Sequence, residues 1–387
     1  MQPSDDSLPR RYLAVLGDAG DIRAWSGIPY HFYQAGLIAN FFSGALDLRA
    51  DRLRWRRLAW NLSQVLRGKH FGGFQYSRSC LNYVFGHVEE RLAECEVVSH
   101  FQLFPPDDLA RRKRLTFSFY IDMPLTRLFE EYGESARIGE SIAREAIQRE
   151  TDGYRHARFV TCMSSWAAQA VREEYGIPEE KVKVILPGAN LDEAIVERLT
   201  ADMDDKPVET DFTPQRPFRL GFIAKHPKRK GLPRLITAAE RLRSWGYPVE
   251  VVVIGSLPSE YRKHAAVRWL GIIDKYQAME QFVQAVKGFD LGCLPSYAEG
   301  LGISTLESLR LGIPVLGTAV GGISDCIPPK AGILVPRDAS PEVIAGAIRP
   351  LLDDPAGYRT MRQEARGTRH YYTWDRAVKE FQKLWSS

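Results

Sequence analysis

The sequence predicts an α/β protein in which two doubly wound domains of parallel strands follow one another along the chain. Three observations support this prediction. Short apolar runs of strand length alternate with helix-like stretches, which is typical of a parallel sheet covered by helices. Between residues 200 and 217 the chain has three prolines and almost no large aliphatic side chains, as expected of an interdomain linker. After this stretch the same alternation begins again.

The N-terminal half begins with the apolar run 12–16 (YLAVL), which is followed by glycine, aspartate and a polar loop. This pattern predicts a buried first strand, and a helix is expected next over 29–37. Further apolar runs predict four more strands, at 97–103, 115–121, 158–162 and 182–186.

The C-terminal half is the more regular of the two. Its predicted strands are 218–223, 249–254, 267–272, 291–295, 315–317 and 333–335, and its predicted helices are 232–245, 277–286, 305–311 and those from 341 onward. We therefore expect an N-terminal domain over 1–205, a C-terminal domain over 206–370, and a helix over 371–387 for which packing back on the first domain is one option. Because open α/β sheets bind ligands at the carboxyl ends of their strands, the site is expected in a cleft between the two domains.

Composition and charge exclude several classes of protein. With 44% hydrophobic and 26% charged residues, the chain is neither disordered nor fibrous. Its 52 basic and 48 acidic residues give a net charge of +4, so basic functions must come from local clusters. Five cysteines without a C-x-x-C pair suggest neither a disulfide framework nor a zinc ribbon. With no signal-like or membrane-spanning apolar stretch, we expect a cytoplasmic protein, with peripheral contact at the inner face of a membrane left open.

The segment 295–326 combines a strand end, a glycine-containing loop and the start of a helix. Glycines before a helix N-terminus let the backbone approach a ligand, and the free amides there favour an anion such as phosphate. The backbone amides of Gly302, Ile303 and Ser304 are therefore candidate ligands of such an anion. An alternative stays open, because Ser304 and Glu307 also have the spacing of a capping box.

The same segment holds two glutamates, Glu299 and Glu307, separated by seven residues. With the stretches 299–303 (EGLGI), 306–315 (LESLRLGIPV) and 320–322 (VGG), this spacing resembles the E-x7-E signature of family 4 retaining glycosyltransferases. The resemblance implies the GT-B fold. It also implies that Glu299 contacts the donor sugar and that Glu307 holds the ribose hydroxyls of the nucleotide. A carboxylate suits the second role because it can accept hydrogen bonds from two vicinal hydroxyls.

A basic run, KHPKRKG at 225–231, follows the first predicted strand after the linker. By composition alone it could be a solvated surface. The resemblance implies instead the arginine and lysine that neutralise the donor diphosphate in this family. Lys230-Gly231 matches the lysine element, whereas the arginine position falls on Ala224 or Lys225. Lys225 is therefore the candidate substitute, although lysine lacks the bidentate fork of arginine.

Two candidate residues come from the N-terminal half, where the resemblance is weaker. Gly27, in WSGIP at 25–29, takes the place of the family's glycine-rich loop and would let the backbone approach phosphates or the acceptor, unless it only forms a turn before a helix. Asp122 follows the strand 115–121, where the family usually has a histidine. It could bind a sugar hydroxyl or position the acceptor, with a helix N-cap as the alternative. His100 is a lesser candidate, because a lone histidine is weak evidence of a site.

The segment 52–88 contains seven lysines or arginines, no aspartate or glutamate, and several interleaved aromatic residues. This composition suits a surface that meets anionic lipid or a phosphate-bearing acceptor. A basic, partly buried insertion explains it equally well. No RNA-recognition motif supports a nucleic-acid partner.

The resemblance implies a retaining transfer of a hexosyl or related sugar from a UDP- or GDP-linked donor to an acceptor hydroxyl, with surface glycan, glycolipid or glycoside synthesis of bacterial type as candidate roles. Glu299 and Asp122 are the candidate catalytic carboxylates, and the acceptor is expected to be lipid-linked or a glycan. No cofactor or metal is expected, because the donor loop lacks a D-x-D pair and cations with helix amides would meet the phosphate charge. A GT-B nucleotide-sugar epimerase and a non-catalytic nucleotide-sugar-binding protein remain alternatives.

Overall fold

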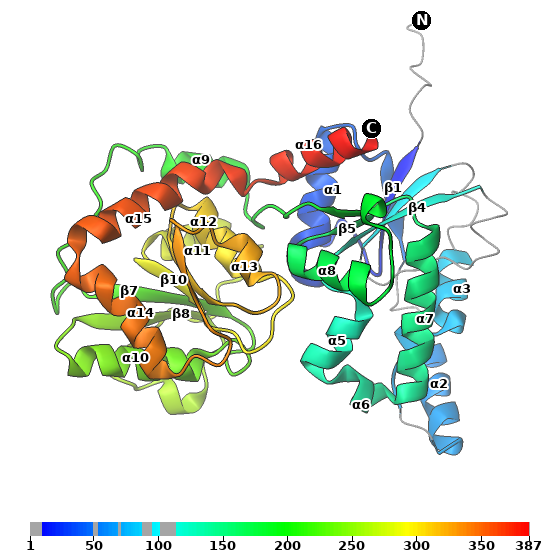
Figure 1. Ribbon diagram of the computed structural model, residues 1–387, viewed down its shortest axis with the longest axis horizontal. Helices are drawn as coiled ribbons and strands as arrows, with labels where there is room; N and C mark the ends of the chain where they lie inside the picture. Colours follow the sequence, from blue (N-terminus) through cyan, green and yellow to red (C-terminus); the bar gives the residue numbers. More distant parts are fainter. Residues whose placement is uncertain (1–9, 49–52, 69–70, 87–94, 101–113, 387) are drawn as a thin grey trace, which may run out of the picture. The chain divides into compact units, whose positions relative to one another are not determined.

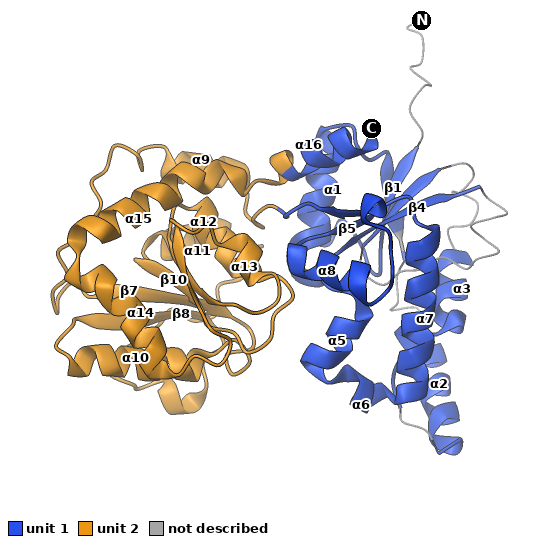
Figure 2. Cartoon of the chain, in the orientation of Figure 1, with its two compact units in different colours: residues 1–187, 377–387 blue, residues 188–376 orange. Residues whose placement is uncertain are grey.

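The computed structural model describes residues 10–48, 53–68, 71–86, 95–100 and 114–386 (Figure 1). The chain divides into two compact units, of which unit 1 comprises residues 1–187 and 377–387 and unit 2 comprises residues 188–376 (Figure 2). Among the residues described, each unit contains one six-stranded sheet whose strands are all parallel. The predicted fold class of two doubly wound α/β domains is confirmed.

The sheet of unit 1 has the strand order β2-β1-β3-β4-β5-β6. Its central strands are almost entirely buried, as expected where helices cover both faces of a parallel sheet. The strands are β1 (Arg11–Val15), β2 (Gly44–Asp47), β3 (Glu96–His100), β4 (Thr116–Ile121), β5 (Val160–Cys162) and β6 (Val182–Val184).

Helices and short 3-10 turns connect these strands. They are η1 (Ala24–Gly27), α1 (Ile28–Ile38), α2 (Arg54–Leu66), η3 (Phe74–Tyr76), α3 (Arg78–Gly86), α5 (Leu125–Tyr132), α6 (Glu134–Ile138), α7 (Glu140–His156), α8 (Ser165–Glu173) and η5 (Glu179–Lys181). The last helix, α16 (Trp374–Trp385), joins unit 1 from residue 377 onward. Its Phe381 ring lies 4.8 Å from Phe32 and 5.0 Å from Tyr120, measured between ring centroids, so this end of the chain completes an aromatic cluster.

The sheet of unit 2 has the order β12-β11-β10-β7-β8-β9. The strands are β7 (Phe218–Ala224), β8 (Val249–Gly255), β9 (Val267–Trp269), β10 (Leu291–Leu294), β11 (Val315–Thr318) and β12 (Gly332–Val335). The other elements are α9 (Glu193–Thr200), α10 (Leu232–Ser244), η6 (Ser259–Tyr261), α11 (Met279–Lys287), α12 (Ile303–Arg310), α13 (Ile323–Cys326), α14 (Pro341–Asp353), α15 (Pro355–Thr368) and η7 (Arg369–Tyr371).

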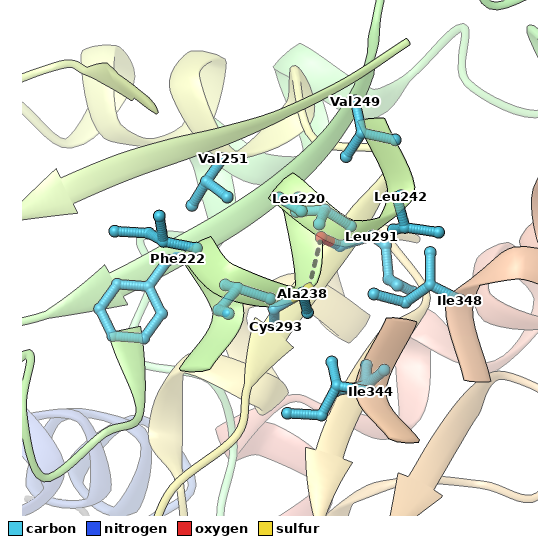
Figure 3. Packing of buried hydrophobic residues seen from close by; sticks show 14 of the residues in the cluster. Leu220, Phe222, Ala238, Leu242, Val249, Val251, Leu291, Cys293, Ile344 and Ile348 are labelled. Atoms are coloured by element: carbon cyan, nitrogen blue, oxygen red, sulfur yellow. Dashed lines mark hydrogen bonds between the residues drawn. The ribbon is translucent and has the colours of Figure 1, made fainter. Parts of the chain in front are cut away.

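The core of unit 2 fills the layer between the central strands and two helices, α10 and α14 (Figure 3). Each fully buried aliphatic or aromatic side chain there contributes about 1.5–3 kcal/mol relative to exposure. This packing makes the sheet a rigid platform for the loops at the carboxyl ends of its strands. The labelled side chains are Leu220, Phe222, Ala238, Leu242, Val249, Val251, Leu291, Cys293, Ile344 and Ile348.

The chain leaves unit 1 after Pro187, whereas the change in composition placed the boundary at 205/206. The intervening residues join unit 2 because α9 packs against α11. The ion pair between Arg198 and Glu280 (2.8 Å) and a hydrogen bond from Lys287 Nζ to the Leu199 carbonyl hold the two helices together. Amino-acid composition shows where apolar residues become scarce along the chain. It does not show that α9 is bound to α11 by polar contacts, so it placed the boundary later in the chain.

All five cysteines are free and buried. Burial raises the pKa of the Cys162, Cys293 and Cys326 thiols far above the ordinary value, so these side chains stay protonated and act as small core residues. Within the described ranges, no helix has the length and apolar character required to cross a bilayer.

Candidate functional site

The loop between β10 and α12 carries the first predicted glutamate, and a buried arginine fixes its start. Arg234 on α10 is only 4% exposed and donates hydrogen bonds to the carbonyls of Pro295 (2.8 Å) and Ser296 (2.7 Å). Its guanidinium also stacks 4.0 Å from the ring centre of Tyr297. The Thr318 hydroxyl donates a further hydrogen bond to the Ser296 carbonyl (2.7 Å). The loop therefore leaves the sheet in one defined direction.

The VGG motif supports the same loop from the other side. Gly321 has a φ of +53°, and a Cβ built there would lie 1.8 Å from the Glu299 carbonyl oxygen. The amide of Gly322 donates a hydrogen bond to the Gly300 carbonyl (2.8 Å). Only glycine combines this conformation with this closeness, so the motif holds the backbone that carries Glu299.

The turn after β7 lies directly against this loop. Gly231 has a φ of +80°, and a Cβ at this position would meet the Pro295 carbonyl oxygen at 1.8 Å. The Tyr297 amide donates a hydrogen bond to the Arg229 carbonyl (2.9 Å). The basic run 225–231 is thus part of the site rather than a separate surface segment.

Three polar groups surround the Glu299 carboxylate. Lys230 Nζ lies 3.2 Å and the Arg229 guanidinium 3.4 Å from Glu299 Oε2, while the Ser296 hydroxyl donates to the same oxygen at 3.3 Å. Arg229 also donates to the Ala298 carbonyl. The structure therefore brings two of the predicted site residues, Lys230 and Glu299, together.

Arg229 was not among the predicted site residues, because the arginine position was sought five or six residues before Lys230. Its place beside Lys230 in the basic run was the available signal. Lys225, the predicted substitute, is exposed at the end of β7. The arginine that contacts the site thus comes from the other end of the run.

Glu307 is 2% exposed on α12 and forms an ion pair with Lys275, which follows β9. Lys275 Nζ also donates a hydrogen bond to the Asn190 carbonyl (3.3 Å). The N-cap of α12 is Gly302, so Ser304 does not occupy the cap position that the capping-box alternative required. Sequence reasoning missed Lys275 because no motif surrounds it.

The three residues predicted to present backbone amides lie together at the start of α12. Gly302 has a φ of +90°, and Ile303 and Ser304 open the helix. Thr305 closes the first turn, because its hydroxyl donates to the Gly302 carbonyl (2.6 Å). A helix N-terminus attracts anions, so this turn and the cations at Glu299 form one region suited to phosphate groups.

The remaining predicted residues belong to unit 1. Gly27 is the N-cap of α1 with a φ of +86°, and it follows Trp25 and Ser26, which also have positive φ. Asp122 is partly exposed at the end of β4. The N-cap of α5 is Pro124, so Asp122 is not the cap that the alternative proposed.

His100 ends β3 and is 1% exposed, with its ring centroid 6.5 Å from that of Trp25. Burial lowers the pKa of His100 to about 3, so the imidazole is neutral near pH 7. Together with Gly27 and Asp122, it lies at the carboxyl end of the unit 1 sheet. In the described part of the chain, no three His, Cys, Asp or Glu side chains form a group able to hold a metal ion.

Comparison with known proteins adds to this geometry. Residues 208–368 match the family described as glycosyl transferases group 1. This part of the chain is similar to that family. The match covers most of unit 2 and includes the basic run, both glutamates and the VGG motif, and we refer to it as the group 1 domain.

Among curated proteins, the chain is 27% identical over 256 residues to D-inositol 3-phosphate glycosyltransferase of Nocardia farcinica, covering 62% of this chain and 56% of the relative. It is 23% identical over 207 residues to 2-deoxystreptamine glucosyltransferase of Streptomyces kanamyceticus, covering 52% of this chain and 53% of the relative. The chain thus spans little more than half the length of these relatives.

Among solved structures, sucrose-phosphate synthase from Thermosynechococcus elongatus superposes with a TM-score of 0.66 at 16% identity and covers 98% of both chains. HepE of Anabaena, solved in complex with UDP-glucose, superposes with a TM-score of 0.59 at 14% identity and covers 98% of this chain and 100% of its own. These likenesses show the fold, and the predicted GT-B architecture is confirmed.

Proposed function

We propose that the protein transfers a sugar from a nucleoside-diphosphate donor to an acceptor hydroxyl, with the donor bound by the group 1 domain. One observation carries this proposal. Within that domain, Lys230 and Arg229 converge on Glu299, directly before the helix N-terminus at Gly302. Cations and amides that gather at the carboxyl end of a parallel sheet suit a diphosphate, and the neighbouring carboxylates suit hydroxyl groups.

Each residue has a role in this proposal. The amides of Ile303 and Ser304 and the side chains of Lys230 and Arg229 bind the diphosphate. The carboxylate of Glu307 accepts hydrogen bonds from the ribose hydroxyls, and Glu299 contacts the donor sugar. The contacts of Gly231, Arg234 and Gly321 hold the turn and the loop that carry Lys230, Arg229 and Glu299, so these groups are already arranged before the reaction begins.

In the transfer, the bond between the sugar C1 and the diphosphate oxygen breaks while the acceptor oxygen bonds to C1. The acceptor proton passes to an oxygen of the departing diphosphate. Negative charge develops on that leaving group, and Arg229 with Lys230 stabilises it. We propose that attack occurs on the face from which the diphosphate leaves, so that the configuration at C1 is retained.

The acceptor side of the proposal rests on unit 1. Asp122 and the turn at Gly27 lie at the carboxyl ends of β4 and before α1, where an acceptor hydroxyl could be positioned. Lipid-linked and glycan acceptors both stay within the proposal. The relatives named above are transferases, which leaves the nucleotide-sugar epimerase alternative without support.

The test is release of free nucleoside diphosphate from a panel of UDP- and GDP-sugars, measured with candidate acceptors. Glu299→Gln should lower turnover by about tenfold or more while the circular dichroism spectrum stays unchanged. Glu260→Gln, at an exposed position of the same unit, is the matched control. Wild-type turnover in Glu299→Gln would refute the assignment. Tight binding of a nucleotide sugar without release from any donor would favour the non-catalytic alternative.

We also propose that the transfer needs no metal ion, because Arg229, Lys230 and the α12 amides provide the positive charge that the diphosphate requires. Turnover should therefore persist after dialysis against EDTA. Loss of activity that Mg²⁺ or Mn²⁺ restores would contradict this part of the proposal.

A further inference from the structure

Helix α2 turns its apolar side outward. At 100° per residue, five large apolar side chains fall within an arc of about 100° on this helix. They are Trp55, Leu58, Leu62, Val65 and Leu66, with exposed fractions of 78%, 50%, 61%, 56% and 78%. An apolar arc on a helix of a globular protein normally faces the core, so this one requires another explanation. We call these five side chains the α2 apolar face.

The opposite side of α2 attaches the helix to unit 1. Trp60 donates a hydrogen bond from its indole nitrogen to the Gly72 carbonyl (2.8 Å), and the Asn61 side chain accepts one from the Gly72 amide (3.0 Å). Gln64 is 3% exposed, and the rings of Trp60 and Phe74 lie 6.1 Å apart. These contacts fix the rotation of the helix about its axis, and they therefore hold the apolar face toward the outside of unit 1.

Basic residues flank the α2 apolar face. On the helical wheel, Arg54 lies about 20° from one edge of the arc, whereas Arg57 on that side and Arg56 and Arg67 on the other lie about 80–100° from the nearer edge. All four are exposed, and the Arg56 guanidinium rests 4.4 Å from the Tyr83 ring centre. The segment 52–88 has seven basic residues and no acidic one, so no carboxylate of its own offsets this charge.

We propose that the α2 apolar face docks on an anionic lipid bilayer, with Trp55, Leu62 and Leu66 entering the boundary between head groups and acyl chains. Arg54 reaches lipid phosphates from beside the face, and the other three arginines reach them from the flanks of the helix through their long side chains. The absence of acidic residues favours this partner over a protein surface, which would normally be matched by charges of both signs. Figure 1 shows α2 at the periphery of the ribbon of unit 1, where a surface can reach it.

This inference goes beyond the proposed sugar transfer and does not depend on it. It concerns the binding of the protein to a membrane surface through helix α2. Each arginine close to an anionic membrane strengthens binding by about fivefold, and salt weakens this attraction. The apolar insertion contributes a second part of the binding that salt does not screen.

The experiment is flotation of the full chain with vesicles of phosphatidylcholine alone or with 30% phosphatidylglycerol, each in low and high salt. We expect binding to the anionic vesicles at low salt, much weaker binding at high salt, and weak binding to the neutral vesicles. The triple variant Trp55→Ser, Leu62→Ser, Leu66→Ser should lose at least tenfold in binding to anionic vesicles at low salt. These positions are exposed, so the melting temperature should change by no more than a few degrees.

The matched control removes three exposed apolar side chains of unit 2, through Trp245→Ser, Leu334→Ser and Val343→Ser, and should bind vesicles as the wild type does. Absence of flotation at low salt, or equal losses in both triple variants, would overturn the proposal. A dimer detected by light scattering that the α2 variant converts to a monomer would overturn it too, because the face would then join two copies of the chain.

Discussion

Replacing Lys275 by methionine should destabilise unit 2, because it leaves the Glu307 carboxylate buried without its cation. The Glu307 side chain is 3% exposed and that of Lys275 is 17% exposed. Removing one partner of a buried ion pair costs about 3–5 kcal/mol. Since Lys275 is partly reached by water, we expect the lower end, about 3 kcal/mol. For a domain of this size, such a loss lowers the melting temperature by about 6–12 °C.

The assay is differential scanning calorimetry of a double-mutant cycle. Glu307→Gln alone should cost less than Lys275→Met, because a neutral amide tolerates burial better than an unpaired carboxylate. The double variant removes both charges, so it should be more stable than the sum of the single losses predicts, by about 1–2 kcal/mol. Lys330→Met, at an exposed position of the same unit, serves as the control.

The cycle also tests the role proposed for Glu307. UDP or GDP should raise the melting temperature of the wild type by mass action. Lys275→Met should keep this increase because the carboxylate is still present, and Glu307→Gln should lose most of it. The reasoning is refuted if Lys275→Met is no less stable than the Lys330→Met control. It is also refuted if the stability loss of the double variant equals the sum of the losses in the two single variants.

Three further outcomes are expected. Gly321→Ala should lower turnover at least tenfold, because its Cβ would lie 1.8 Å from the Glu299 carbonyl oxygen. Release of nucleoside diphosphate at the wild-type rate would contradict this expectation. Burial raises the pKa of Glu150 to about 7, above its unfolded value, so its contribution of about 3 kcal/mol is complete below pH 4.5 and is lost as pH rises through 7. In urea denaturation at a series of pH values, Glu150→Gln should reduce this decrease in the free energy of unfolding. An unchanged dependence on pH would argue against the role of Glu150. Lys230→Met should reduce kcat/KM for the donor about tenfold or more and Lys225→Met much less, whereas equal effects would count against the geometry.

The strands were predictable where the chain buries both faces of the sheet. The runs 12–16 and 218–223 correspond to β1 and β7 because strands covered by helices on both sides read as continuous apolar stretches. The four-residue strand β2 was not predicted, since so short an element leaves little periodic signal. Helix α2 was not predicted either. Prediction from sequence assumes that the apolar side of a helix packs against the core, and the apolar side of α2 does not.

The candidate site was predictable to the extent that it is local. The spacing of Glu299 and Glu307 and the glycines around them lie in one stretch, so the sequence alone indicated a ligand-binding loop. Lys275 and Arg234 contact that stretch from 32 and 61 residues away. The residues next to them in the sequence do not identify them as site residues, because the order of strands in the sheet determines which residues they contact.

The partners of the two glutamates bear on how a donor enters the proposed site. Glu299 is held by Lys230 and Arg229, and Glu307 is held by Lys275, so both carboxylates are paired with cations. Buried charges are costly unless paired, and these contacts provide that pairing. Under the proposed function, the diphosphate takes over Arg229 and Lys230, and the ribose hydroxyls take over the Glu307 oxygen that Lys275 contacts. Two cations face the Glu299 carboxylate, and under the proposed function both turn toward the diphosphate during that exchange.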